Sequence, residues 1–383
     1  MNSPWMPAVF WFLAALVVRF CVAVLVHVYS IGAGFEGFYP LESGHDDRFY
    51  FETATQIAEG YEPGALPSVY PLILGYMFRW FGADLLLGKL INSVLGAFSV
   101  MLGVLLAERL RPWRGHPWAL KRSGHLAGFL LTLYPSSLFY STQLLKDPSI
   151  LVLGMWLLYI FVVLYNKARF SYTLVAALVS GLLLLFRPYA AVALWLAFGV
   201  FVLLKRRSIR TLVLVAGLAA VVPWVLGLGP FALSYLSPLL NPEQISEFRT
   251  EVYGIGGSSL GVSLEPSNPL AFILGWLYSV VTVLLGPFPW QVKSPVTALA
   301  LGEASLMWIL LLRAKPSLRS LLRPSLEELP LVSALVLAGV IGLFSDNVGA
   351  NTRLRLLAWS LMFVYIAARV GGGGASSLRH NPR

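Results

Sequence analysis

The sequence has little charge and almost no cysteine. Charged residues make up 12% of the 383 residues, whereas soluble domains carry about 25%. Hydrophobic residues make up 57%, and the mean hydropathy is +0.74. These values exclude an ordinary soluble domain and predict a membrane protein. The one cysteine, Cys21, lies inside an apolar run, so an intramolecular disulfide and a cysteine-based metal site are also excluded.

The net charge of +10 comes from 28 Lys and Arg against 18 Asp and Glu. A basic total often indicates nucleic-acid binding, but here the basic residues stand in short clusters between apolar runs, as the positive-inside rule requires of cytoplasmic loops. These clusters are 109–122, 166–169, 205–210, 313–323 and 379–383. We therefore expect membrane lipids and no nucleic acid as partners, and we expect all five clusters to be cytoplasmic.

A helix that crosses a bilayer needs about 20 apolar residues. The candidate runs are 7–29, 84–108, 124–142, 149–165, 171–186, 189–204, 211–228, 269–285, 296–312, 329–345 and 354–369. Three of these runs stand between the cytoplasmic clusters 205–210 and 313–323, and an odd number of crossings cannot return the chain to the side it left. We expect the proline-bordered run 269–285 to be re-entrant or interfacial, because its edges are typical of a broken helix.

The expected fold is an all-α integral membrane bundle of about ten spans with both termini in the cytoplasm. A single transmembrane domain would cover 1–370, and a disordered cytoplasmic tail would cover 371–383. Two long loops, 30–83 and 229–268, would lie on the extracytoplasmic face. The second loop is acidic and contains a stretch rich in Gly and Ser, which is typical of a mobile lid and equally of a solvated connector.

One polar stretch, GHDDRFYFETA at 44–54, follows the first apolar run. Asp46, Tyr50 and Ala54 repeat at a spacing of four, which predicts an amphipathic helix over 46–59 in the first outer loop. Asp46 and Asp47 stand in its first turn, where the helix dipole stabilises negative charge by about 0.3–1 kcal/mol. Capping is therefore a sufficient structural explanation for this pair if the stretch is taken alone.

Further motifs follow in order along the chain. Asp46, Asp47, Tyr50 and Ala54 match the spacing D-E-x-x-Y-x-x-x-A, with Asp in place of the Glu. The later matches are Tyr70-Pro71-Leu72, Phe81-Gly82, Asn92, and the stretches 133–150, 185–189 and 347–356. Together they resemble the GT-C superfamily of membrane glycosyltransferases, most closely its protein-mannosyltransferase and aminoarabinose-transferase branch. The resemblance covers most of the first 190 residues and a short piece near the end.

This resemblance implies a glycosyltransferase of cell-envelope glycan biosynthesis in a bacterial inner or plasma membrane. It would transfer a sugar, with inversion, from a polyprenyl-phosphate-linked donor to a glycan, lipid or protein acceptor on the extracytoplasmic face. The family assigns the first acid of the pattern as the base that takes the acceptor's proton, a role that carries over to Asp46. Asp47 is then the runner-up or an orienting partner.

The leaving phosphate needs fixed positive charge. Lys146, Arg187 and Arg353 stand at outer helix ends of the expected topology and are candidates for a phosphate clamp, although such residues can also only snorkel to the membrane surface. The remaining candidate substrate-binding residues are His45, Tyr50, Asp147, Tyr189 and Arg355. A divalent metal ion would suit the side chains of His45, Asp46, Asp47 and Asp147, but their spacing does not require one.

Three other functions stay open. A glycan polymerase or ligase that uses lipid-pyrophosphate donors shares this chemistry, but it would usually carry more arginine in its outer loops. A lipid-linked glycan flippase or other transporter would show similar halves and charges near the bilayer midplane, and the two halves of this chain show no similarity. A non-catalytic assembly subunit would keep the fold without the chemistry.

Overall fold

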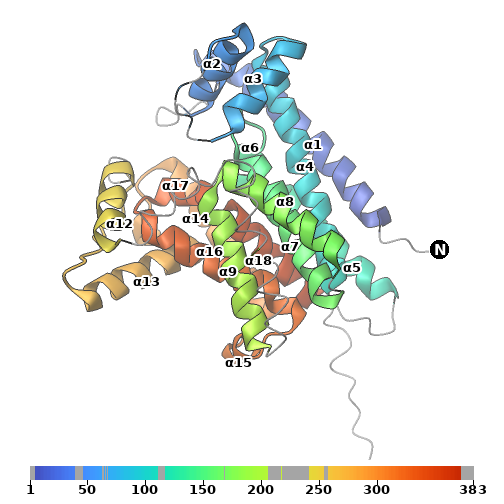
Figure 1. The fold of residues 1–383 in the computed structure, drawn as a ribbon, viewed down its shortest axis with the longest axis vertical. Coiled ribbons are helices and arrows are strands. Elements are labelled where there is room, and N and C mark those ends of the chain that lie inside the picture. The colour runs from blue at the N-terminus through green and yellow to red at the C-terminus, as the bar shows by residue number, and fades with distance from the viewer. Residues whose placement is uncertain are drawn as a thin grey trace, which may run out of the picture.

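The structure, a computed structural model, describes residues 5–38, 46–62, 64, 66, 68–110, 117–167, 169–205, 217, 241–253 and 258–371. Within these residues all regular secondary structure is helical (Figure 1). The helices are α1 (Trp5–Gly32), α2 (Asp46–Glu59), α3 (Tyr70–Phe81), α4 (Leu85–Leu110), α5 (Pro117–Leu133), α6 (Pro135–Tyr140), α7 (Asp147–Asn166), α8 (Phe170–Phe186), α9 (Pro188–Leu204), α12 (Pro242–Phe248), the π-helix η2 (Arg249–Tyr253), α13 (Pro269–Leu285), the 3₁₀ helix η3 (Pro289–Gln291), α14 (Pro295–Ala314), α15 (Leu318–Leu322), the 3₁₀ helix η4 (Leu326–Glu328), α16 (Leu329–Phe344), α17 (Val348–Leu354) and α18 (Leu356–Val370). The expected tail beyond 371 and the expected run 211–228, apart from Gly217, lie outside the described residues.

Five segments among the described residues are long and apolar enough to cross a membrane: Trp5–Gly32, Leu85–Leu110, Asp147–Asn166, Thr297–Ala314 and Leu326–Phe344. Shorter apolar helices are α8, α9, α13 and α18. The expectation of an all-helical protein with membrane-length apolar helices is confirmed, whereas about ten crossings and their direction stay predictions.

Proline marks the start of many of these helices. It occupies the first position of α6, α9, α12, α13 and α14, where its fixed φ suits a helix and its missing N–H is not needed. Pro135 also ends the helix before it, because proline disfavours helical backbone in the preceding residue, here Tyr134 with ψ 106°. The expectation of a single span over 124–142 is therefore wrong: α5 and α6 are separate helices.

The core of the bundle lies around α18, which packs against α4, α7 and α16. α18 is buried along almost its whole length, including the large side chains of Trp359 and Tyr365. α1 packs along α4 at the edge of the bundle, and its most apolar stretch is only 17% buried. Side chains such as Leu13, Val17 and Leu25 are exposed there, as expected of a helix that faces lipid.

α2 and α3 pack against each other at one end of the molecule (Figure 1). The inner face of α2 is made of Asp47, Tyr50, Ala54 and Ile57, and the Tyr50 ring packs edge-on against the ring of Tyr70 in α3, 5.1 Å between centroids. This packing decides which side of α2 is buried, and it leaves Asp46 on the outer side.

The described part of the loop 229–268 is not all irregular. It contains α12 and η2, and the segment after them runs antiparallel to the chain between α16 and α17. Leu260 N donates to Asp346 O at 2.7 Å, and Val348 N donates to Ser258 O at 2.9 Å. This part of the loop is therefore fixed to the chain just before α17.

α13 has the bounds expected for the run 269–285, and it is one continuous helix that packs on α16. In the view of Figure 1 it lies crosswise to α9. Whether α13 crosses a membrane, re-enters it or lies at its surface stays a prediction.

Candidate functional site

Four helix ends that are far apart in the sequence, those of α2, α7, α9 and α17, meet at one place. Asp46 begins α2, Asp147 begins α7, Arg187 precedes α9, and Arg353 lies in the last turn of α17. Arg353 NH1 lies 2.5 Å from Asp46 Oδ2, although the two residues are 307 positions apart. Arg353 Nε lies 2.6 Å from Asp147 Oδ2, and Arg187 NH2 lies 3.2 Å from Asp147 Oδ1. We call these four residues and the adjacent Lys146 the Arg353 cluster.

Asp147 is the centre of this cluster. Its side chain is 2% exposed and receives one arginine on each carboxylate oxygen. Its place in the first turn of α7 adds the favourable field of a helix N-terminus. Asp147 therefore holds Arg187 and Arg353 at fixed positions, and its burial between them argues against a role as a base.

Arg353 is the residue that joins the two carboxylates. Burial by itself would lower the pKa of its guanidinium, but the carboxylates of Asp147 and Asp46 outweigh that effect, and the pKa is raised well above its ordinary value. Arg353 is therefore a permanent cation. Its side chain is still 20% exposed and that of Asp46 is 54% exposed, so their ion pair lies at the rim of the cluster, where a ligand can reach it.

Lys146 adds a third cation. Its ammonium group makes no hydrogen bond or ion pair with the described residues, and burial together with the neighbouring Arg187 lowers its pKa to about 8. The cluster therefore has three cations and two carboxylates, a net charge of +1 when Lys146 is protonated. An anion beside Lys146 would favour the charged ammonium and so oppose this lowering of the pKa.

A small cavity adjoins the cluster, with a volume of about 10 Å³, enough for about one water molecule. Asp147, Arg187, Tyr189 and Arg353 form its polar wall, and the Arg187 guanidinium lies over the Tyr189 ring, 5.6 Å from the centroid. The apolar wall consists of aliphatic side chains from five helices, among them Ile150, Ala190, Leu337, Leu354 and Leu357. Cations and aliphatic side chains thus meet at one place, at the start of the membrane-length helix α7.

Asp47 does not join the cluster. It is 1% exposed and its Oδ1 accepts a hydrogen bond from Arg48 N at 2.9 Å. Its charge also interacts with the buried Lys89 of α4, whose ammonium donates to Gly37 O at 2.6 Å. Two adjacent acids on a helix point about 100° apart, so Asp47 turns into the bundle while Asp46 turns toward Arg353.

Tyr50 lies on the inner face of α2, about one helical turn after Asp46. It is 4% exposed, and burial together with the charge of Asp46 raises the pKa of its hydroxyl to about 12. The phenol therefore stays neutral, and it does not line the cavity beside the cluster.

Asn92 has a role that the motif comparison did not reveal. Its side-chain amide donates to Gln143 O at 2.6 Å, to Leu145 O at 2.8 Å and to Tyr70 OH at 2.9 Å. It thereby fixes the turn that leads into Lys146 and Asp147. One feature of the sequence does indicate this role, a lone amide within the apolar run of α4. A buried amide in a membrane helix needs polar partners.

Arg355 lies elsewhere, in a second buried cluster. Its guanidinium lies 3.6 Å from the centroid of the Trp359 ring and 3.7 Å from Glu303 Oε2, and it donates to Gly286 O. Glu303 in turn accepts hydrogen bonds from Ser136 N and Oγ at 2.7 and 2.6 Å. The position of Arg355 therefore does not support its predicted role in substrate binding. His45, another predicted substrate-binding residue, lies outside the described residues.

A divalent metal ion does not fit the side chains that the structure describes. Among them no group of three or more His, Cys, Asp or Glu side chains is placed to bind one. Asp46 and Asp147 are bridged by Arg353, and Asp47 faces the other way.

Comparison with known proteins adds no relative: no family model matches this chain, and no curated protein matches it significantly. The chemistry of the site is therefore argued from its own residues.

Proposed function

We propose that this protein is an integral-membrane glycosyltransferase of the GT-C type, which moves a sugar from a polyprenyl-phosphate-linked donor to a glycan, lipid or protein acceptor. One observation carries the proposal. A half-exposed carboxylate, Asp46, is paired with an arginine that belongs to a cluster with more cations than carboxylates, beside an aliphatic wall. Such an arrangement can bind an anionic lipid headgroup and place a base next to it.

The donor phosphate would bind at the rim of the cluster. Arg353 offers a planar, permanently charged donor for phosphate oxygens, and Lys146 offers a point charge. The isoprenoid chain would lie in the surrounding membrane, because the aliphatic lining of the cavity, such as Ile150, Leu337 and Leu357, is at most 4% exposed and encloses room for only about one water molecule. The cavity itself is too small for a sugar, so the sugar would lie outside it, on the side of the exposed Asp46.

Binding of the phosphate would also free the base. The phosphate competes with Asp46 for Arg353, and the released carboxylate can accept the proton of an acceptor hydroxyl. The acceptor oxygen then forms a bond to the anomeric carbon of the sugar. The bond from that carbon to the phosphate oxygen breaks, its electron pair leaves with the lipid phosphate, and Arg353 and Lys146 stabilise the added negative charge.

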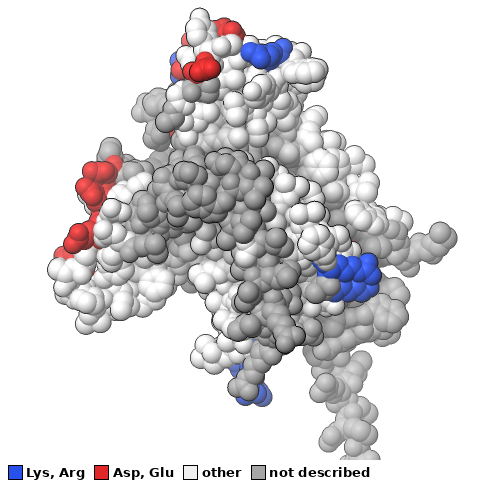
Figure 2. All heavy atoms as spheres, in the orientation of Figure 1, with Lys and Arg blue, Asp and Glu red and all other residues white. Residues whose placement is uncertain are grey.

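The surface charge supports the proposed orientation. On the face shown in Figure 2, acidic side chains lie over α12, both acidic and basic side chains lie at the α2–α3 end, and basic side chains lie toward the other end of the molecule, including the region of α15. Exposed residues there include Arg319 and Arg323, while Glu243 and Glu247 are exposed on α12. Basic residues favour the cytoplasmic side, so the Arg353 cluster would face the extracytoplasmic side.

The test is a transfer assay with purified protein in detergent. A panel of polyprenyl-phosphate sugars is incubated with candidate acceptors, with and without a chelator, and the release of free lipid phosphate is measured. Asp46→Asn should reduce release about 10²–10⁴-fold. Asp84→Asn is the matched control, because Asp84 is also exposed near a helix start but only accepts a hydrogen bond from Leu87 N.

Two results would contradict the proposal. If Asp46→Asn inserts normally and transfers sugar as well as the wild type, Asp46 is not the base. If lipid is released only from pyrophosphate-linked donors, the protein is a polymerase or ligase and the monophosphate donor is wrong.

A further inference from the structure

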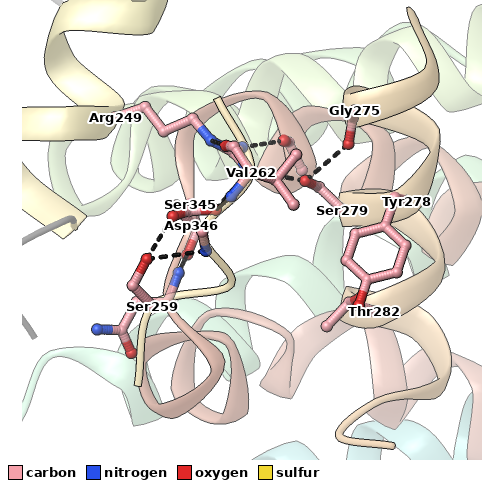
Figure 3. Close-up of polar contacts among 12 residues, drawn as sticks. Arg249, Ser259, Val262, Gly275, Tyr278, Ser279, Thr282, Ser345 and Asp346 are labelled. Carbon is pink, nitrogen blue, oxygen red and sulfur yellow. Dashed lines mark hydrogen bonds and ion pairs between the residues drawn. The ribbon is translucent and has the colours of Figure 1, made fainter. Parts of the chain in front are cut away.

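A second polar cluster lies between the long loop and α17 (Figure 3). It joins four segments: η2 through Arg249, the extended segment through Ser259 and Val262, α13 through Ser279, and the chain after α16 through Asp346. We call this set of residues the loop clasp. It is separate from the Arg353 cluster and contains none of the residues that the sequence motifs indicated.

Arg249 uses all three of its side-chain nitrogens in the loop clasp. Nε donates to Val262 O at 3.1 Å, NH1 donates to Gly342 O at 2.7 Å, and NH2 donates to Ser279 Oγ at 2.8 Å and to Asp346 Oδ1 at 2.9 Å. The side chain is 2% exposed. A buried arginine with a hydrogen bond at every nitrogen holds its partners in one arrangement, because a shift leaves a buried polar group without a partner.

Asp346 connects this arrangement to α17. It accepts from Ser259 Oγ at 2.6 Å and from Val262 N at 3.3 Å, in addition to Arg249. The next residue, Asn347, caps α17 by accepting from Ala350 N at 2.9 Å, and it also accepts from Ser258 Oγ at 2.7 Å. The start of α17 is therefore held by the loop.

α17 is too short to keep its own position. It has seven residues, and helices of that length are not stable without tertiary contacts. Its first residue follows the loop clasp, and its last turn carries Arg353, which bridges Asp46 and Asp147. A displacement at the start of this helix would therefore move Arg353 relative to both carboxylates.

We propose that Arg249 and Asp346 are positioning residues for Arg353, and that through them the loop segments 241–253 and 258–262 control the phosphate-binding geometry of the site. This inference rests on the proposed function, since it takes the Arg353 cluster as the site of the lipid phosphate. Any ligand that shifts the loop clasp would then be coupled to donor binding.

The experiment measures the affinity of farnesyl phosphate for the purified full-length protein in detergent, together with amide hydrogen exchange in 346–354. Arg249→Gln should weaken binding about 5–50-fold, within the usual range of coupling between sites, and should speed exchange in α17. Arg249→Lys keeps the charge that faces Asp346 and should recover part of the loss. Arg369→Gln is the matched control, because Arg369 pairs with Glu327 and Glu328 outside both clusters, and it should bind like the wild type.

If folded Arg249→Gln keeps wild-type affinity and exchange, the loop clasp does not position Arg353. If Arg249→Gln does not fold, Ser259→Ala removes a single donor to Asp346, and an unchanged affinity and exchange there would also overturn the inference. Arg353→Gln separates the two proposals: if it binds farnesyl phosphate like the wild type, the phosphate site and the proposed function fail, while exchange in α17 still reports on the clasp.

Discussion

Replacing Asp147 by Asn should change stability and anion affinity in opposite directions. Asp147 is 2% exposed and carries ion pairs to Arg187 and Arg353. The amide has almost the same shape, so the change removes charge and little else. The charge of the Arg353 cluster rises from 3 − 2 = +1 to 3 − 1 = +2.

The expected magnitude follows from burial. Removing one partner of a buried ion pair costs about 3–5 kcal/mol, because the remaining charge is left uncompensated. Arg353 keeps its pair with Asp46, so we expect a loss of about 3 kcal/mol in the free energy of unfolding. A bound phosphate would restore the missing negative charge, and a ligand present at 100 times its dissociation constant contributes about 2.7 kcal/mol.

The assay is thermal unfolding in detergent, with and without farnesyl phosphate. Asp147→Asn should unfold at a lower temperature than the wild type, and farnesyl phosphate should stabilise the variant more than it stabilises the wild type. Glu303→Gln is the matched control, because Glu303 is also a buried carboxylate with an arginine partner, Arg355, but outside the site. It should lose stability without added rescue by the ligand.

The reasoning is refuted by either of two results. Asp147→Asn could be as stable as the wild type, which would mean that the two arginines do not depend on it. Alternatively, farnesyl phosphate could stabilise Glu303→Gln as much as Asp147→Asn, which would mean that the effect is not local to the cluster.

Three further predictions concern neighbouring residues. Asp47→Asn should lower the unfolding temperature and, in protein that remains folded, leave sugar transfer within about threefold of wild type, because Asp47 is buried away from Arg353; a loss as large as that of Asp46→Asn would contradict this. The affinity for farnesyl phosphate should fall as pH rises above about 8, because the pKa of Lys146 is lowered to about 8 and its ammonium is lost, and Lys146→Arg should bind without this decline. Since this pKa lies below the ordinary 10.5, the unfolded chain binds more protons between the two values, and this residue makes stability rise with pH over that window. Asn92→Leu should weaken donor binding by displacing the turn before Lys146 and cost about 1–3 kcal/mol of stability, measured by titration and unfolding together.

Much of the architecture could be predicted from local sequence. Apolar runs of sufficient length and the prolines that begin α9, α13 and α14 indicate where these helices lie, because hydrophobic length and proline backbone restrictions act locally. The error at 124–142 has the same origin, since hydropathy alone continues through Pro135 although the helix does not.

The sequence by itself determined that this is a helical protein with membrane-length apolar segments, and it indicated Asp46, Lys146, Arg187 and Arg353 as candidate site residues. Local spacing could not distinguish Asp46 from Asp47, because only the packing of α2 on α3 decides which acid is buried. The pairing of Arg353 with Asp46 across 307 positions, and of Arg249 with Asp346 across 97, was decided by the tertiary structure alone. Ion pairs of this kind depend on where helix ends meet in space, and no periodicity within one segment records that.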